Sequence, residues 1–376
     1  MCVKEKRRDE TNNNDEGATH EKEFCRCCRT MDSAEAAAPA AAEAAPQATP
    51  EAAPQLTPAA PSTAEAAPRP APAAEEPKRR SLRKRARVAP APPPAQQLLS
   101  LLGECESALI FTGSGVSASA GMSTFSAPGG LYEQARRRYG LDSGKRLFSW
   151  PFFAKHRPQA QAFFAKIFRE AAAAEPTASH AALASLARSG KVRRVFTMNV
   201  DGLHRQAERG GAGGGGGTVE MHGCVLELVC AGGHRAALTQ TEAQLFEREA
   251  AVPCATCGEQ LRSAIMLYGD KQESIVVGDW PALMNEDLRS VDLIVWAGIS
   301  FEQSASVEYF RRVHRARASP EVRHVLINPD DSAAFNLRSA ISNLGEADIV
   351  ELSATSDELL PVVAEQMRAR ADDTLS

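Results

Sequence analysis

The chain has 376 residues, a formal net charge of −4 and nine cysteines. That charge gives no reason to expect nucleic-acid binding by the molecule as a whole, and the chain contains no run of about eighteen apolar residues that would span a membrane. The odd number of cysteines, behind an N-terminus without the apolar core of a secretory signal, argues against a disulfide framework and favours a reducing compartment.

Residues 1–95 differ in composition from the rest of the chain. Their central part, 34–74, consists almost entirely of Ala, Pro, Glu, Thr and Gln. Such a segment buries too little apolar surface to offset the entropy lost on folding, so we predict a disordered tail. Cys25, Cys27 and Cys28 lack a second pair of ligands, and we interpret this cluster as incidental.

A dense basic run, KRRSLRKRAR at residues 78–87, lies in this tail. Clusters of this kind in a flexible setting are typical of nuclear-import signals and of nucleic-acid contacts. The alternative is a charged run that only keeps the chain soluble. We therefore predict a nuclear protein, with the cytoplasm as the second choice.

The first predicted strand of the folded part is the apolar run at 107–112, which ends on a glycine turn. This turn has the G-x-G-x-x-A pattern of a dinucleotide-binding loop. Gly113 permits the tight turn, Gly115 lets a pyrophosphate approach the main chain, and Ala118 lets the next helix pack closely with its N-terminus toward the anion. The acidic residue that dehydrogenases carry about twenty positions later is missing, which argues against an ordinary dehydrogenase.

Polar side chains follow the second predicted strand, at 191–197. Asn199 and Asp201 come directly after it, and His222 follows a glycine run at 210–217 that we predict to be a flexible loop. Asn, Asp and His at strand ends are the residue types expected at the ligand edge of a parallel α/β sheet. The alternative is that Asn199 and Asp201 cap the next helix and that His222 lies on a surface loop.

Four residues have the spacing of a structural metal site. Cys254 and Cys257 form a C-x-x-C pair, and Cys230 and His234 precede them. Three thiolates and one imidazole make a closed tetrahedral zinc site without an open position for catalysis. Cys224 is an outside candidate for the fourth ligand, and the alternative is a ribbon without metal.

Strands and helices alternate along the rest of the chain. The second predicted helix has Ser179 as its cap and Gly190 as its stop. This alternation predicts an α/β fold with a mostly parallel sheet and helices on both faces. The further strands that we expect are 291–297, 322–328 and 347–352, and the helices are 158–174 and 178–189.

Taken in order, these segments resemble the sirtuin family, the NAD-dependent protein deacylases related to silent information regulator proteins. The resemblance covers residues 96–368 and implies a Rossmann-like sheet with a small inserted zinc-ribbon and helical module at about 225–265. The family's motifs are matched by GSGVSASAGMSTFSA at 113–127, TMNVDGLH at 197–204, His222-Gly223, the pair at 254–257, IMLYGD at 265–270, GIS at 298–300 and IN at 327–328.

The resemblance implies a protein-lysine deacetylase or deacylase that moves the acyl group from lysine to ADP-ribose and releases nicotinamide. It implies that His222 is the base, that Asn199 lies by the nicotinamide ribose, that Asp201 holds the carboxamide, and that Phe125 covers the reactive ribose carbon. The partners it implies are acylated lysines on proteins, with histones as one candidate and with no nucleic acid bound by the folded domain. The acyl-lysine peptide would add as a strand beside residues 265–269. The remaining NAD contacts that it implies are Gly113, Ser114, Gly115, Ser117, Gly298, Ser300 and Asn328.

Three positions depart from the family pattern: Thr124 stands for Asp, Ser126 for Arg and Met198 for Gln. Loss of the Arg removes a cation near the NAD phosphates, and a hydroxyl does not replace a bidentate phosphate contact. These changes favour a non-catalytic sensor of NAD or ADP-ribose, whereas His222 favours an enzyme. A protein ADP-ribosyltransferase is the third alternative.

Overall fold

The computed structural model describes residues 92–209, 217–342, 344–345 and 348–375. The predictions for the tail, including its basic run at 78–87 and its three cysteines, lie outside these residues, as does nearly all of the glycine run. Within the described ranges, no helix is both long and apolar enough to cross a membrane.

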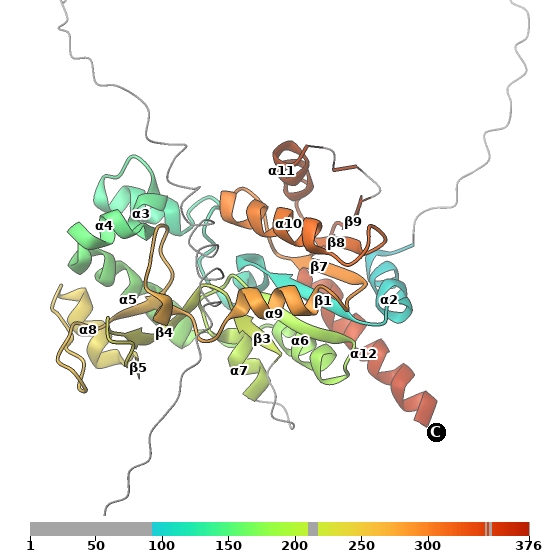
Figure 1. Cartoon of the computed structure of the whole chain (residues 1–376), viewed down its shortest axis with the longest axis horizontal. Coiled ribbons are helices and arrows are strands. Elements are labelled where there is room, and N and C mark those ends of the chain that lie inside the picture. The colour runs from blue at the N-terminus through green and yellow to red at the C-terminus, as the bar shows by residue number, and fades with distance from the viewer. Residues whose placement is uncertain (1–91, 210–216, 343, 346–347, 376) are drawn as a thin grey trace, which may run out of the picture. The chain divides into compact units, whose positions relative to one another are not determined.

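A six-stranded parallel sheet forms the centre of the folded part (Figure 1). The strand order is β3-β2-β1-β7-β8-β9, and each neighbouring pair is parallel. Five of these strands were predicted from the sequence, whereas the short β3 was not. The strands are β1 (Ala108–Thr112), β2 (Val192–Thr197), β3 (Thr218–Glu220), β7 (Leu293–Ala297), β8 (Arg323–Ile327) and β9 (Ile349–Leu352).

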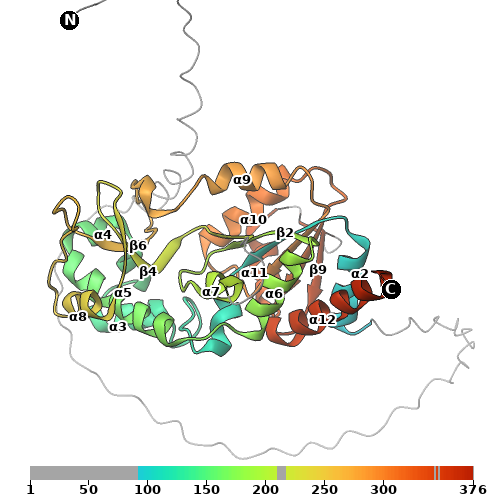
Figure 2. The ribbon, with the colours of Figure 1, turned by 90° about the horizontal axis from the view of Figure 1, so that it is seen from below.

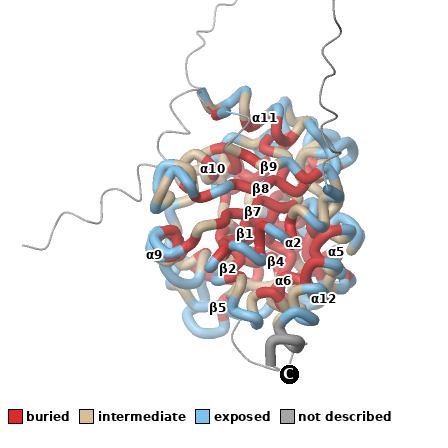
Figure 3. Tube along the Cα trace, turned by 90° about the vertical axis from the view of Figure 1, so that its right-hand side faces the viewer, coloured by how far each residue is buried: buried red, intermediate tan, exposed pale blue. Residues whose placement is uncertain are grey.

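Helices cover both faces of this sheet, because successive residues of a strand point to opposite sides. In β1, Ala108 and Ile110 pack against one helix layer, and Leu109 and Phe111 pack against the other. Figure 3 shows the central strands buried and the outer sides of the helices exposed. The first layer contains α2 (Pro94–Glu104), α6 (Ala178–Arg188) and α12 (Ser356–Leu375), and the second contains α9 (Trp280–Asp287), α10 (Ser304–Ala316) and α11 (Ser332–Ala340).

A smaller module lies at one end of the parallel sheet (Figure 2). Its antiparallel sheet has the order β5-β4-β6 and packs with its helices around a separate cluster rich in phenylalanine. The strands of the module are β4 (Gly223–Val229), β5 (Arg235–Ala237) and β6 (Arg262–Ile265), and its helices are α3 (Leu131–Tyr139), α4 (Trp150–Lys155), α5 (Arg157–Ala173) and α8 (Gln240–Glu247).

The glycine turn does lead into a helix, the 3₁₀ helix η1 (Ser114–Ala120). One local prediction needs correction. The cap of α6 is Thr177 and not Ser179, because the His180 side chain completes a capping box with the Thr177 main chain. Gly190 does follow the end of α6 in a left-handed conformation, with a φ of 78°.

A pair of histidines, the buried His324 and the half-buried His314, joins β8 to α10. The indole N–H of Trp296 donates to Nδ1 of His324 at 3.2 Å, and Nε2 of His324 lies 3.3 Å from Nδ1 of His314. Because indole only donates, His324 carries its proton on Nε2 and donates it to His314. Burial, together with the smaller effects of the nearby His314 and Arg317, lowers the pKa of His324 to about 3. His324 is therefore neutral in the folded protein at physiological pH.

We expect the free energy of unfolding to fall as the pH drops below 6.5, the ordinary pKa of His324. In that range His324 of the unfolded chain binds a proton, whereas His324 of the folded chain stays neutral until the pH approaches about 3. The loss from this residue is about 2 kcal/mol between roughly pH 7 and pH 5, measurable by urea denaturation. His324→Gln, whose side-chain oxygen can still accept from Trp296, should show a loss smaller by about that amount. An equal loss in both proteins would contradict the assignment.

Candidate active site

A cavity of about 200 Å³ lies at the carboxyl edge of the parallel sheet, where it meets the smaller module. Its wall comes from the residues that follow β1, β2, β3 and β7, from the start of α10 and from the segment after β6. The lining residues are Gly113, Ser114, Phe125, Ser126, Tyr132, Phe148, Met198, Asn199, Val200, His222, 265–269, Gly298, Ile299, Ser300, Gln303, Ala305, Ser306 and Tyr309.

Two main-chain turns touch at the floor of this cavity. The N–H of Gly115 donates to the carbonyl oxygen of Gly298 at 3.0 Å. A Cβ on Gly113 would lie 2.7 Å from that same oxygen, and a Cβ on Gly115 would lie 2.8 Å from Cα of Gly298. No side chain fits between the turns, and Gly298 has a φ of 65° that also favours glycine. The cavity floor is thus bare main chain, which suits the close approach of a dinucleotide phosphate.

Asn199 and Asp201 hold the glycine turn to β2. The amide of Asn199 donates to the carbonyl of Gly113 and to Oγ of Ser117, both at 3.1 Å. Oγ of Ser117 donates in turn to Oδ2 of Asp201 at 2.7 Å, and Oδ1 of Asp201 accepts the N–H of Leu203 at 3.0 Å. Asp201 therefore does cap the start of α7 (Leu203–Arg209), which was the alternative interpretation from the sequence.

His180 extends this network to the start of α6. Its Nδ1 accepts the N–H of Thr177 at 3.1 Å, so the neutral ring carries its proton on Nε2. That Nε2 lies 3.4 Å from Oγ of Ser117. Burial lowers the pKa of His180, against the opposing effect of Asp201 and Asp357, and keeps the ring neutral. The buried polar groups behind the glycine turn therefore form one connected set.

His222 faces the cavity with a defined tautomer. Its Nδ1 lies 3.0 Å from the carbonyl oxygen of Met198, which can only accept, so Nδ1 carries the proton of the neutral ring. Its Nε2 lies 3.0 Å from the hydroxyl of Tyr309 and is the acceptor of that bond. Burial lowers the pKa of His222 to about 4, against the smaller opposing effect of the Met198 carbonyl. At neutral pH, Nε2 is therefore an unprotonated base inside the cavity.

The structure brings most of the proposed cofactor residues together. Six of them line the cavity, together with the proposed base His222: Gly113, Ser114, Phe125, Asn199, Gly298 and Ser300. Among the described residues that line it, Gly115, Ser117, Asp201 and Asn328 do not appear. Ser117 and Asp201 are buried, Gly115 is exposed, and the half-buried Asn328 donates from its amide to the carbonyl of Ile299 at 3.1 Å.

Ser126, one of the three departures from the family pattern, is bonded to a residue that the sequence did not mark. The amide of Gln303 donates to Oγ of Ser126 at 2.6 Å, which ties the segment after Phe125 to the start of α10. Gln303 is the residue that precedes α10, and no motif singles it out. The hydrogen bond between Gln303 and Ser126 is uncharged, and it lies where the family pattern has the cationic Arg side chain.

The segment after β6 forms the outer wall of the cavity. A buried ion pair fixes it: Nη1 of Arg262 lies 2.8 Å from Oδ2 of Asp270, and both side chains are 3% exposed. The main-chain N–H and carbonyl of Tyr268 are bonded to Phe148 and Trp150, at 2.9 and 2.8 Å. A substrate strand beside residues 265–269 therefore cannot use the Tyr268 groups without displacing this pairing.

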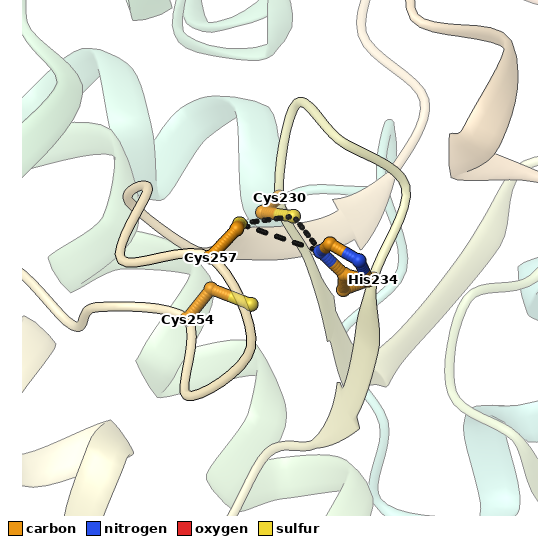
Figure 4. A group of neighbouring side chains, drawn as sticks. All are labelled: Cys230, His234, Cys254 and Cys257. Atoms are coloured by element: carbon orange, nitrogen blue, oxygen red, sulfur yellow. Dashed lines mark hydrogen bonds between the residues drawn. The ribbon is translucent and has the colours of Figure 1, made fainter.

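The four proposed metal ligands converge at one point of the module (Figure 4). Their ligand atoms all lie within 4.8 Å of one another. Sγ of Cys230 is 3.6 Å from Sγ of Cys257 and 3.4 Å from Nδ1 of His234, which is 3.3 Å from Sγ of Cys257. Ligand atoms around a tetrahedral zinc lie about 3.6–3.8 Å apart, so the cluster with Cys254 as its fourth member fits zinc.

The local chain geometry explains why His234 can be a ligand. Gly233 has a φ of 80° and donates its N–H to the carbonyl of Cys230 at 3.0 Å, which turns the chain back and points His234 at the cluster. The amide of Gln272 also bonds to the carbonyl of Cys230 at 2.8 Å. The N–H groups of Cys257 and Thr256 lower the pKa of the Cys254 thiol, which favours the thiolate that zinc binds.

Comparisons with known proteins agree with this geometry. A family model described as the Sir2 family matches residues 113–305. The NAD-dependent protein deacetylase 2 of Streptomyces coelicolor is 29% identical over 211 residues, which cover 55% of this chain and 82% of that protein. The NAD-dependent protein deacetylase of Bacillus subtilis is 30% identical over 214 residues, which cover 54% of this chain and 77% of the relative.

Solved structures with the same fold carry related ligands. A Sir2 homologue in complex with NAD aligns with a TM-score of 0.56 at 21% identity, and the alignment covers 73% of this chain and 94% of that one. A Sir2 structure with a deacetylated p53 peptide and 3′-O-acetyl ADP-ribose aligns with a TM-score of 0.57 at 20% identity, covering 72% and 97%. At this level of identity the likeness establishes the fold alone.

We expect the purified full-length protein to contain about one zinc ion per chain, measured by elemental analysis. The double variant Cys254→Ser with Cys257→Ser should lose this zinc, because it removes two of the four ligands. Cys105→Ala is the matched control, since Cys105 is a buried thiol outside the cluster. A full equivalent of zinc in the double variant would show that these residues do not hold the metal.

Proposed function

The chain belongs to the Sir2 family, and on that premise we propose that it is an NAD-dependent protein-lysine deacylase. The observation that carries this proposal is the position of His222. Its unprotonated Nε2 opens into the same cavity as the bare glycine turns and the segment after β6. The proposed base, phosphate cradle and peptide-binding edge thus border one cavity.

The residues of the chain fit an NAD molecule in this cavity. Gly113, Gly298 and Ser300 offer main chain and a hydroxyl to its phosphates, and Asn199 lies beside them at the end of β2. Bound NAD supplies the ADP-ribose that accepts the acyl group and the nicotinamide that leaves. Zinc has no part in this chemistry, since its four protein ligands leave no open position.

The protein residues move one proton and exclude water. Nε2 of His222 takes the proton of a ribose hydroxyl, and the Met198 carbonyl stabilises the charged ring that results. Phe125 packs with its ring 5.6 Å from that of Phe148, and both line the cavity. These aromatic side chains shield the reacting carbon from water.

We propose that the acyl-lysine substrate enters along the outer wall formed by residues 265–269, without using the main-chain groups of Tyr268 that are bonded to Phe148 and Trp150. We infer a protein partner with an exposed acylated lysine, and histones are the candidates that a nuclear location would offer. We propose no nucleic-acid partner for the folded domain. The products formed from NAD and an acetyl-lysine peptide distinguish the deacylase from a non-catalytic sensor and from an ADP-ribosyltransferase.

We expect His222→Ala to lower turnover on an acetyl-lysine peptide by about a hundred- to ten-thousandfold, the usual cost of losing a positioned base. NAD affinity, measured by calorimetry, should change little because the glycine turns are intact. Mass spectrometry should detect acyl-ADP-ribose from the wild type. Wild-type turnover in the variant would contradict the role of His222. NAD binding without turnover by the wild type would favour the sensor, and ADP-ribosylated protein would favour the transferase.

We also propose that the basic run at 78–87 directs the protein to the nucleus, because its density of Lys and Arg is typical of import signals. A fluorescent fusion in which Arg79, Arg80, Lys84 and Arg85 are changed to Ala should lose nuclear enrichment under the microscope. The zinc content and turnover of the same variant should equal those of the wild type, since the change lies outside the folded part. Nuclear enrichment that persists would refute the import signal.

A further inference from the structure

Two groups on opposite sides hold the His222 ring. The Met198 carbonyl binds Nδ1 and the Tyr309 hydroxyl binds Nε2, each at 3.0 Å. The first bond requires the proton on Nδ1, so the second requires the Tyr309 hydroxyl to donate. The second bond therefore places the phenol of Tyr309 at Nε2, the nitrogen that takes the substrate proton.

Tyr309 is held rigidly by its neighbours. It lies within α10, and its ring packs edge-on against Trp280 of α9 with centroids 5.7 Å apart. The next residue, Phe310, is fully buried and packs on Trp296 with ring centroids 5.1 Å apart. These contacts anchor α10 in the core, so the hydroxyl of Tyr309 has a fixed position at the cavity wall.

Among the described residues, the hydrogen bonds of the His222 ring include no side chain from the segment after β2. Met198 stands where the related family has Gln, and a thioether is only a weak acceptor. Its contribution to His222 comes from its main-chain carbonyl alone among the bonds of the described residues. The Tyr309 hydroxyl is thus the side-chain group that orients the ring.

We propose that Tyr309 is a positioning residue for His222: its hydroxyl holds the ring with Nε2 directed into the cavity and leaves the Nε2 lone pair when a substrate hydroxyl takes its place. This inference rests on the proposed deacylase function. In the reaction the substrate hydroxyl donates to Nε2; an N–H bond forms there and the O–H bond of the substrate breaks, leaving its electron pair on the oxygen. A phenol suits both states of the ring, because it donates to the neutral Nε2 and accepts from the protonated one.

The test compares Tyr309→Phe with Tyr139→Phe. The first keeps the ring against Trp280 and removes only the hydroxyl. The second removes the same group from a tyrosine whose hydroxyl donates to the carbonyl of Gln159 at 2.9 Å, outside the cavity lining. In Tyr309→Phe we expect kcat to fall about tenfold while KM for NAD and for the acetyl-lysine peptide change less than about twofold. Tyr139→Phe should retain the wild-type kcat.

A spectroscopic readout makes the test independent of turnover. In protein labelled with ¹⁵N-histidine, with the His222 signals assigned from His222→Ala, the Nε2 signal of the wild type should be that of an unprotonated, hydrogen-bonded nitrogen. In Tyr309→Phe it should move toward the value of a free acceptor. An unmoved signal, or an unchanged kcat, overturns the inference. If the wild type shows no turnover, the deacylase assignment fails, and the ¹⁵N signal alone then supports or overturns the contact.

Discussion

The whole ligand edge depends on the contact between two glycine turns where strands β1 and β7 end. Gly115 and Gly298 approach so closely that a single Cβ on either one would collide with main chain at 2.6–2.8 Å. This contact sets the distance between the first strand and the loop that starts α10. Since Gln303 directly precedes α10 and Tyr309 lies within it, this contact also decides whether their polar groups reach Ser126 and His222.

The site has two kinds of polar contact, and they differ in exposure. Behind the cavity wall, the buried Ser117 and Asp201 bond to each other and to Asn199, which itself lines the cavity, and the described lining residues include no carboxylate. At the wall itself, His222 and Gln303 point into the space where the ligand binds. Substitutions in the first group act on folding and on the geometry of the turn, whereas those in the second act on chemistry and affinity.

The parts of this protein that were predictable from its sequence have strong local signals. Strand β7 is a short apolar run buried on both faces, and the metal ligands Cys254 and Cys257 have a spacing that few other structures require. Tyr309 has no such signal, because it lies on an amphipathic helix where an aromatic residue usually belongs to the core. Its role depends on the packing of α10 against a distant strand end. The choice between Thr177 and Ser179 as a cap likewise depended on the side chain of His180, a tertiary detail.

The polar network behind the glycine turn also couples two helices. The N–H of Thr177, at the start of α6, donates to His180, which faces Ser117; Ser117 donates to Asp201, which accepts the N–H of Leu203 at the start of α7. Opening the start of either helix breaks a hydrogen bond of this network and leaves a buried polar group without a partner, which costs free energy. The two helix starts and the turn between them should therefore open as one cooperative unit. Their amide protons would exchange with solvent at rates set by a single opening free energy, although the two segments are far apart in sequence.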